Sequence, residues 1–289
     1  YDILAETATD IGAPGNDNVT GAGLINALDA VSSALPNNTP NIVETSVTSE
    51  IEENVTVNLT GAFEDLDLGD THTLEIDWGD PNDENLTMLE LVPGEREFEF
   101  THTYQDDGLA PGNETPSDTA TILVKVKDDS GAEDTQSVET LVKNVEPIID
   151  PTIDVQVTVI DDNYDGDDNE GLLITIEGSF LDPGNLDLHT GTVRWSDGLS
   201  LGMDDIALGD RTFSTSRFLS ENELEDNFPE IDNDDNYSPD ENFPGELDED
   251  DIYKLGVNIS LEDDDMGMDT KPFEFFVSEQ GRTFIPEML

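Results

Sequence analysis

The chain has 289 residues, no cysteine, and 70 aspartate and glutamate residues against 10 lysines and arginines, so its formal net charge is −60. A surface of this sign repels DNA, RNA and anionic lipid, because proteins bind these polyanions through Lys and Arg. No apolar run reaches the roughly 18 residues of a membrane-spanning helix, and without cysteine neither disulfides nor thiolate metal sites are available. We therefore expect no nucleic-acid partner and no membrane insertion.

Residues 1–35 predict two short helices joined by a glycine-rich turn. In the second helix, Leu24, Leu28 and Val31 follow the three-to-four spacing of a helical face. The glycines between the helices allow backbone conformations that a side chain would obstruct. Chains below about 40 residues rarely form an independent core, so this segment needs a partner to pack against.

The spacing T-A-x-D-x-G-x-x-G-x-D-x-x-x-G-x-G-x-I-N-A-x-x-A-V at residues 7–31 resembles the closing segment of the subtilisin-like serine protease (subtilase) domain. The resemblance implies that the chain begins inside an α/β domain and that residues 1–35 are its C-terminal helices. It also implies a partner, the upstream catalytic domain of the same polypeptide, which would carry the Ser-His-Asp triad of an endopeptidase.

No triad motif lies in the chain itself. Three histidines occur, His72, His102 and His189, and none lies near a G-x-S-x-G or G-T-S-type turn. A serine nucleophile needs an adjacent base and an orienting carboxylate. We therefore expect no catalytic residue in the chain as given.

After a short linker at 36–41, helical spacing gives way to alternation. Val57 and Leu59 alternate with polar residues, and Val124 and Val126 lie in a second alternating run. A period of two predicts half-buried strands. Many such strands in succession are typical of a β-sandwich.

The chain then repeats itself. A string that starts as G-x-F-x-D at Gly61 and ends as W-G-D at Asp80 aligns without gaps on the string from Gly178 to Asp197, with a constant shift of 117 residues. Such internal similarity indicates two copies of one domain.

The repeated strings resemble the polycystic-kidney-disease (PKD) repeat, an immunoglobulin-like β-sandwich. The resemblance implies a mainly β protein with two tandem sandwiches, at 42–147 and 152–279, preceded by the short helical remnant and followed by a tail at 280–289. The second copy departs from the pattern, because Ser196 replaces the Gly of W-G-D and no clear H-x-Y string follows. The resemblance implies that the two sandwiches act as spacers or as docking surfaces for protein or polysaccharide.

The recurrent residues have structural roles available. We expect Trp78 and Trp195 to fill the sandwich cores, as large aromatics often do in these folds. Asp80 and Asp197 follow directly and suit the acceptance of hydrogen bonds from turn amides. The three histidines are expected to be structural residues with hydrogen-bond partners.

An acidic insertion in the second copy covers about 219–251 and contains three prolines, at positions 229, 239 and 244. A like-charged run interrupted by proline is typical of a solvated loop or a disordered segment. The alternative is a loop ordered by calcium, since Ca²⁺ prefers oxygen ligands.

A sharper calcium candidate follows the strand pattern of Val155, Val157 and Val159. The sequence there has the D-x-N-x-D-G first half of an EF-hand loop, but the twelfth position is Leu172 and not Glu. The loop is thus either a Ca²⁺ site without EF-hand helices or a solvated hairpin loop. Its candidate metal ligands are Asp161, Asn163, Asp165, Asp167 and Asn169.

These observations predict the noncatalytic C-terminal region of a secreted subtilase-like serine endopeptidase, located outside the cell or on its surface. The alternative is a calcium-binding extracellular adhesin or surface stalk without protease activity. Adaptation to high salt is a third explanation of the acidity and is compatible with either function.

Overall fold

The computed structural model describes residues 2–34, 36–160, 170–232, 252–278 and 283–284. The candidate calcium loop at 161–169 and most of the acidic insertion lie outside the described residues.

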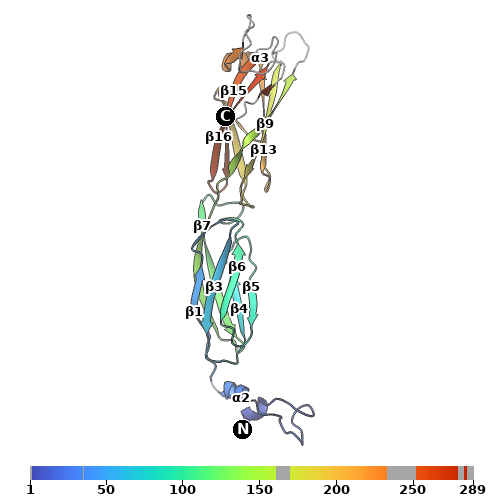
Figure 1. Cartoon of the computed structure of the whole chain (residues 1–289), viewed down its shortest axis with the longest axis vertical. Helices are drawn as coiled ribbons and strands as arrows, with labels where there is room; N and C mark the ends of the chain where they lie inside the picture. Colours follow the sequence, from blue (N-terminus) through green and yellow to red (C-terminus); the bar gives the residue numbers. More distant parts are fainter. Residues whose placement is uncertain (1, 35, 161–169, 233–251, 279–282, 285–289) are drawn as a thin grey trace. The chain divides into compact units, whose positions relative to one another are not determined.

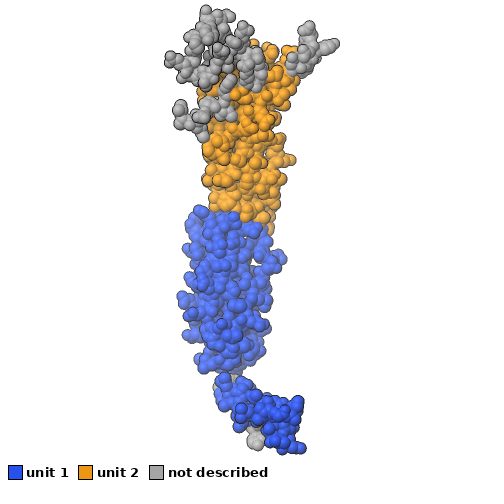
Figure 2. Space-filling model, turned by 45° about the vertical axis from the view of Figure 1, so that its right-hand side comes forward, with its two compact units in different colours: residues 1–108, 117–143 blue, residues 109–116, 144–289 orange. Residues whose placement is uncertain are grey.

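The chain divides into two compact units, shown in different colours in Figure 2. The first unit holds residues 1–108 and 117–143, and the second holds 109–116 and 144–289. Residues 109–116 were expected in the first sandwich and group with the second unit instead. In each unit the strands run side by side, as Figure 1 shows.

The N-terminal segment forms the two expected short helices, α1 (Asp2–Glu6) and α2 (Ala27–Ala34). Between them, Thr9 and Leu24 pair through two main-chain hydrogen bonds of 2.8 and 2.9 Å. The turn requires glycine at position 23, because its φ is +114° and an added Cβ would lie 2.2 Å from the Thr9 carbonyl oxygen.

The first sandwich has a three-stranded sheet, in the order β1-β3-β6, and a five-stranded sheet, in the order β2-β8-β7-β4-β5. Neighbouring strands are antiparallel except β2 and β8, which are parallel. The bounds are β1 (Asn41–Val47), β2 (Glu50–Glu52), β3 (Thr56–Glu64), β4 (His72–Asp77), β5 (Thr87–Leu91), β6 (Glu97–Thr103), β7 (Ser117–Asp128) and β8 (Glu133–Lys143).

The second sandwich repeats this plan. Its first sheet has the order β13-β10-β9, and its second has the order β12-β11-β15-β16-β17, with β14 also paired to β15. The bounds are β9 (Ile148–Ile160), β10 (Gly171–Leu181), β11 (His189–Trp195), β12 (Ser200–Gly202), β13 (Thr212–Ser220), β14 (Glu230–Asp232), β15 (Ile252–Asp263), β16 (Met268–Ser278) and β17 (Thr283–Phe284).

Each sandwich has its own apolar core, as the alternating patterns predicted. Val57 and Leu59 on β3 and Val124 and Val126 on β7 are all buried. Inward-facing side chains of the two sheets fill the space between the layers, and polar residues alternate with them on the outer faces. The chain is therefore mainly β, with immunoglobulin-like sandwiches.

The expectation of a solvated loop is wrong for the first part of the acidic insertion. Ser220 caps helix α3 (Glu221–Asn227), and its hydroxyl accepts from the Glu223 amide while the Glu223 side chain bonds back to the Ser220 amide. Leu224 and Phe228 are buried in the second core. This pair spaced by four residues, together with the capping box, favours a helix despite the acidic residues around it.

Candidate functional site

The two tryptophans fill the cores, which confirms their predicted role: Trp78 is 3% exposed and Trp195 is 1% exposed. Asp80 accepts from the Asn82 amide at 2.8 Å, and Asp197 accepts from the Leu199 amide at 3.0 Å. Both aspartates therefore bind turn amides as expected.

A basic side chain lies against each tryptophan, and its identity differs between the copies. In the first sandwich the His102 ring stacks on Trp78 with 4.9 Å between ring centroids, and its Nε2 lies 2.9 Å from Oδ2 of Asp80. In the second, the Arg217 guanidinium lies 5.0 Å from the Trp195 ring centroid and pairs with Asp197.

Arg217 was not predicted, because the second copy has a different residue type at this position. In the strand pairing, His102 stands opposite Val57 and Arg217 stands opposite Ile174, which are equivalent positions in the repeat. The whole segment from the tryptophan to this position is two residues shorter in the second copy, since 102 − 78 is 24 and 217 − 195 is 22. The missing H-x-Y string is therefore replaced by R-x-L at residues 217–219.

The other two histidines are enclosed with aspartates. Nε2 of His72 lies 2.7 Å from Oδ2 of Asp65, and Nε2 of His189 lies 2.8 Å from Oδ2 of Asp182, with all four side chains at most 1% exposed. All three histidines of the chain are thus structural residues with carboxylate partners, as expected. Neither enclosed imidazole can reach a substrate in solvent.

Carboxylates gather beside each enclosed pair. In the first sandwich, oxygens of Asp65, Asp70 and Asp128 lie within 4.8 Å of one another. Burial raises the pKa of Asp70, and the charges of Asp129 and Asp67 act in the same direction. The strings D-x4-D-x-H at 65–72 and 182–189 were the sequence signal for this feature, but no role was predicted for their aspartates.

The second sandwich has the equivalent cluster, in which Asp182, Asp187 and His189 place ligand atoms within 4.8 Å of one another. A carboxylate oxygen of Asp187 also lies within 4.8 Å of one of Asp265. Asp265 belongs to the β15–β16 turn, where its neighbour Asp264 has a pKa raised chiefly by burial.

The candidate calcium ligands predicted from sequence, Asp161, Asn163, Asp165, Asp167 and Asn169, lie outside the described residues. The structure brings together a different set of acids, and these lie on the strands and turns of the repeated framework. The string D-x4-D-x-H is local, but Asp128 and Asp265 are far from it in sequence, so only the fold shows that they lie beside it.

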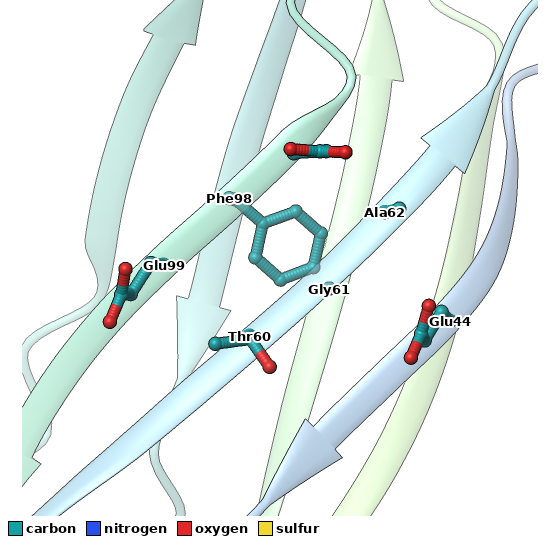
Figure 3. A pocket seen from close by; sticks show the side chains of 7 residues that line it. Glu44, Thr60, Gly61, Ala62, Phe98 and Glu99 are labelled. Atoms are coloured by element: carbon teal, nitrogen blue, oxygen red, sulfur yellow. The ribbon is translucent and has the colours of Figure 1, made fainter.

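The first sandwich also has a hollow of about 380 Å³ on the sheet β1-β3-β6. Figure 3 shows the Phe98 ring extending from β6 toward Gly61 on β3, with Glu44 and Glu99 on either side. A Cβ at Gly61 would lie 2.2 Å from Cζ of Phe98, so glycine is required for this packing. Three exposed glutamates, Glu44, Glu97 and Glu99, surround the hollow.

An equivalent hollow of about 420 Å³ lies on the sheet β13-β10-β9 of the second sandwich. Gly178 and Phe213 pair there as Gly61 and Phe98 do, with a Cβ of Gly178 reaching 2.3 Å from the ring. Its rim is again acidic, and consists of Glu177, Asp204, Asp205 and Asp210.

The N-terminal segment exposes many apolar side chains for its size. None of α1 is buried, and the predicted apolar face of the second helix also lies in solvent. The exposed set comprises Ile3, Leu4, Ile11, Val19, Leu24, Ile25, Leu28 and Val31. A concentration of this kind marks an interaction surface.

No family model and no curated protein matches the chain. Among solved structures, it is similar to the chicken CNTN1 FN1-FN3 domains, with a TM-score of 0.22 and 10% identity over 82% of this chain and 68% of that one. A structure of carbohydrate-binding modules from the β-sandwich superfamily has a TM-score of 0.28 and 12% identity, over 86% of this chain and 100% of that one. A chimeric titin Z1Z2-Z1Z2 tandem has a TM-score of 0.21 and 14% identity, over 81% of this chain and 97% of that one.

All three similar structures are built from immunoglobulin-like or fibronectin-like β-sandwiches. The architecture of this chain is evident from its own strand pairing. Within the described residues, no helix combines the length and apolar character needed to cross a bilayer.

Proposed function

We propose that this chain is a noncatalytic docking and spacer region of a secreted, subtilase-like serine endopeptidase. The main support for docking is the hollow with an acidic rim that recurs at the same place in both sandwiches. The enclosure of His72 and His189 supports the noncatalytic part of the proposal, because a general base must reach its substrate.

The upstream catalytic domain is the proposed partner of residues 1–35. The subtilase-like spacing at 7–31 supports this partner, and so do the exposed apolar side chains of the same segment. Burial of such a surface by another domain is favourable by about 25 cal/mol per Å² of apolar area removed from water.

The chemistry of the hollows favours a cationic protein segment as the docked partner over a polysaccharide. Sugar recognition on sandwich surfaces relies on accessible aromatic rings, whereas Phe98 and Phe213 are buried beneath the rims. Glu44, Glu97 and Glu99 instead suit lysine and arginine side chains, whose apolar stems can lie along the hollow.

Retention of the full chain on beads tests this proposal. Beads carrying a lysine-rich peptide, chitin or cellulose are compared at 0.15 M salt, and we expect retention by the peptide. Retention should fall in the Glu44→Gln, Glu97→Gln, Glu99→Gln variant. It should persist in a control with the same charge change on exposed positions of other strands, Glu52→Gln, Glu133→Gln, Glu139→Gln. Equal losses in the two variants, or retention by a polysaccharide alone, would refute the cationic partner.

Calcium binding by the loop at 161–169 remains a proposal that rests on the sequence pattern. The alternating oxygens of Asp161, Asn163 and Asp165 suit Ca²⁺, which takes six to eight oxygen ligands. The Asp161→Ala, Asp165→Ala double variant should then bind one ion fewer than the native chain.

A further inference from the structure

We propose a second divalent-cation site in the second sandwich, between Asp187 and Asp265 and separate from the loop at 161–169. Ca²⁺ is the ion that fits it. The site joins the end of the acidic turn between β15 and β16 to the segment that precedes β11.

The burial of Asp265 is the first argument. This residue is 1% exposed, and its Oδ1 accepts a hydrogen bond of 2.8 Å from the Asn113 amide. Its Oδ2 is buried and has no hydrogen-bond partner. A buried carboxylate oxygen without a partner is costly, because desolvation of a charged group is not offset.

The position of Asp187 is the second argument. Asp187 is also 1% exposed, and one of its carboxylate oxygens lies within 4.8 Å of one of Asp265. Two carboxylates at this separation repel each other strongly in a water-poor environment. A cation between them would relieve the repulsion and supply the partner that Oδ2 of Asp265 lacks.

The basic side chains described nearby bond other groups. Nε, Nη1 and Nη2 of Arg211 all donate to main-chain carbonyls, those of Asp182, Asp210 and Gly184. His189 pairs with Asp182. Hard carboxylate oxygens suit Ca²⁺. Asp182 also places a carboxylate oxygen within 4.8 Å of one of Asp187.

The first sandwich provides an internal comparison. His72 pairs with Asp128 across strands as His189 pairs with Asp263, so the position equivalent to Asp265 is Ser130. Asp70, the counterpart of Asp187, is only half-buried. The first sandwich therefore lacks the buried acid that defines the site, and we expect the tighter binding in the second.

Calorimetric titration of CaCl₂ into the full chain at fixed ionic strength tests the site. The Asp265→Asn variant keeps an acceptor for the Asn113 amide but lacks the charge. We expect this variant to lose one bound ion or to bind that ion at least about tenfold more weakly. Substitution of residues that only contact a metal ligand already lowers metal affinity by about this factor. The exposed control Asp205→Asn should titrate as the native chain does.

Two further variants separate the possible outcomes. Asp187→Asn should repeat the loss, while Asp161→Ala, Asp165→Ala should leave this ion bound even if the loop site disappears. The proposal is overturned if Asp265→Asn binds calcium as the native chain does. It is also overturned if Asp205→Asn loses as much calcium binding as Asp265→Asn, because that result indicates diffuse binding to the acidic surface. A third contradicting result is a melting temperature that Asp265→Asn raises equally with and without calcium, because that result indicates a proton shared between Asp187 and Asp265.

Discussion

Trp78 and Trp195 show how one residue type is kept in place by different neighbours. Each lies in a core, and each has a basic side chain beside it that also pairs with the aspartate two residues farther on, Asp80 or Asp197. The permanently charged guanidinium of Arg217 replaces an imidazole in the second copy, and both groups lie against an indole ring.

Replacement of either tryptophan by alanine should destabilise its own sandwich by about 3–5 kcal/mol, the usual cost for a large buried aromatic. Because the chain has two tryptophans, fluorescence of the remaining one reports on the unchanged sandwich. Circular dichroism during urea unfolding measures the loss. The control Phe218→Ala removes a ring that is 39% exposed and should shift stability by no more than about 0.5 kcal/mol. A tryptophan variant that behaves like this control would contradict the core assignment.

The Asp197–Arg217 pair predicts a pH dependence. The hydrogen bond from Arg217 holds the pKa of Asp197 below its ordinary value of 3.8. A carboxylate with a lowered folded-state pKa stabilises the fold above its unfolded pKa, and that stabilisation is lost as pH falls through the folded value.

The Asp197→Asn variant should therefore be less stable than the native chain at pH 6, and the gap should narrow as pH falls below 3.8. Urea unfolding at pH 6 and near pH 3, without calcium, measures both gaps. The exposed control Asp205→Asn should show no comparable gap at either pH. A gap for Asp197→Asn that is the same at both pH values would rule out the ion pair as its cause.

At the scale of elements, helix α3 shows where the sequence was insufficient. Acidic composition predicted a solvated loop, but Leu224 and Phe228 contribute to the core and Ser220 caps the helix. A capping box needs only a serine or threonine and a glutamate or glutamine three residues later, so it is easily overlooked in an acidic segment. The glycine-aromatic pairs, Gly61–Phe98 and Gly178–Phe213, were equally hidden, because they depend on strand register.

Ser220→Ala should destabilise the second sandwich by about 1 kcal/mol, the typical effect of losing an N-cap side chain. Ser220→Thr keeps the hydroxyl and should recover most of that loss. Urea midpoints of the three proteins provide the measurement, each in a Trp78→Phe background so that Trp195 is the remaining tryptophan. Equal midpoints for the alanine and threonine variants would show that the hydroxyl has no capping role.

At the scale of the whole molecule, the repeat was the most informative part of the sequence. Alternation and the shift of 117 residues indicated two sandwiches with tryptophan cores, and the strand pairing bears this out. The proximity of Asp187 and Asp265 was not predicted. Asp187 precedes β11 and Asp265 lies in the turn between β15 and β16, so only the fold shows that these two acids become buried together.

We propose that this chain is the noncatalytic region of a serine endopeptidase, and one labelling experiment tests this proposal directly. The secreted protein that contains residues 42–289 is captured with an antibody to that region, treated with a fluorophosphonate probe, and digested for mass spectrometry. We predict a labelled serine upstream of Tyr1 and none within the 289 residues. No labelled serine in the captured protein, or a labelled serine inside this chain, would contradict the account.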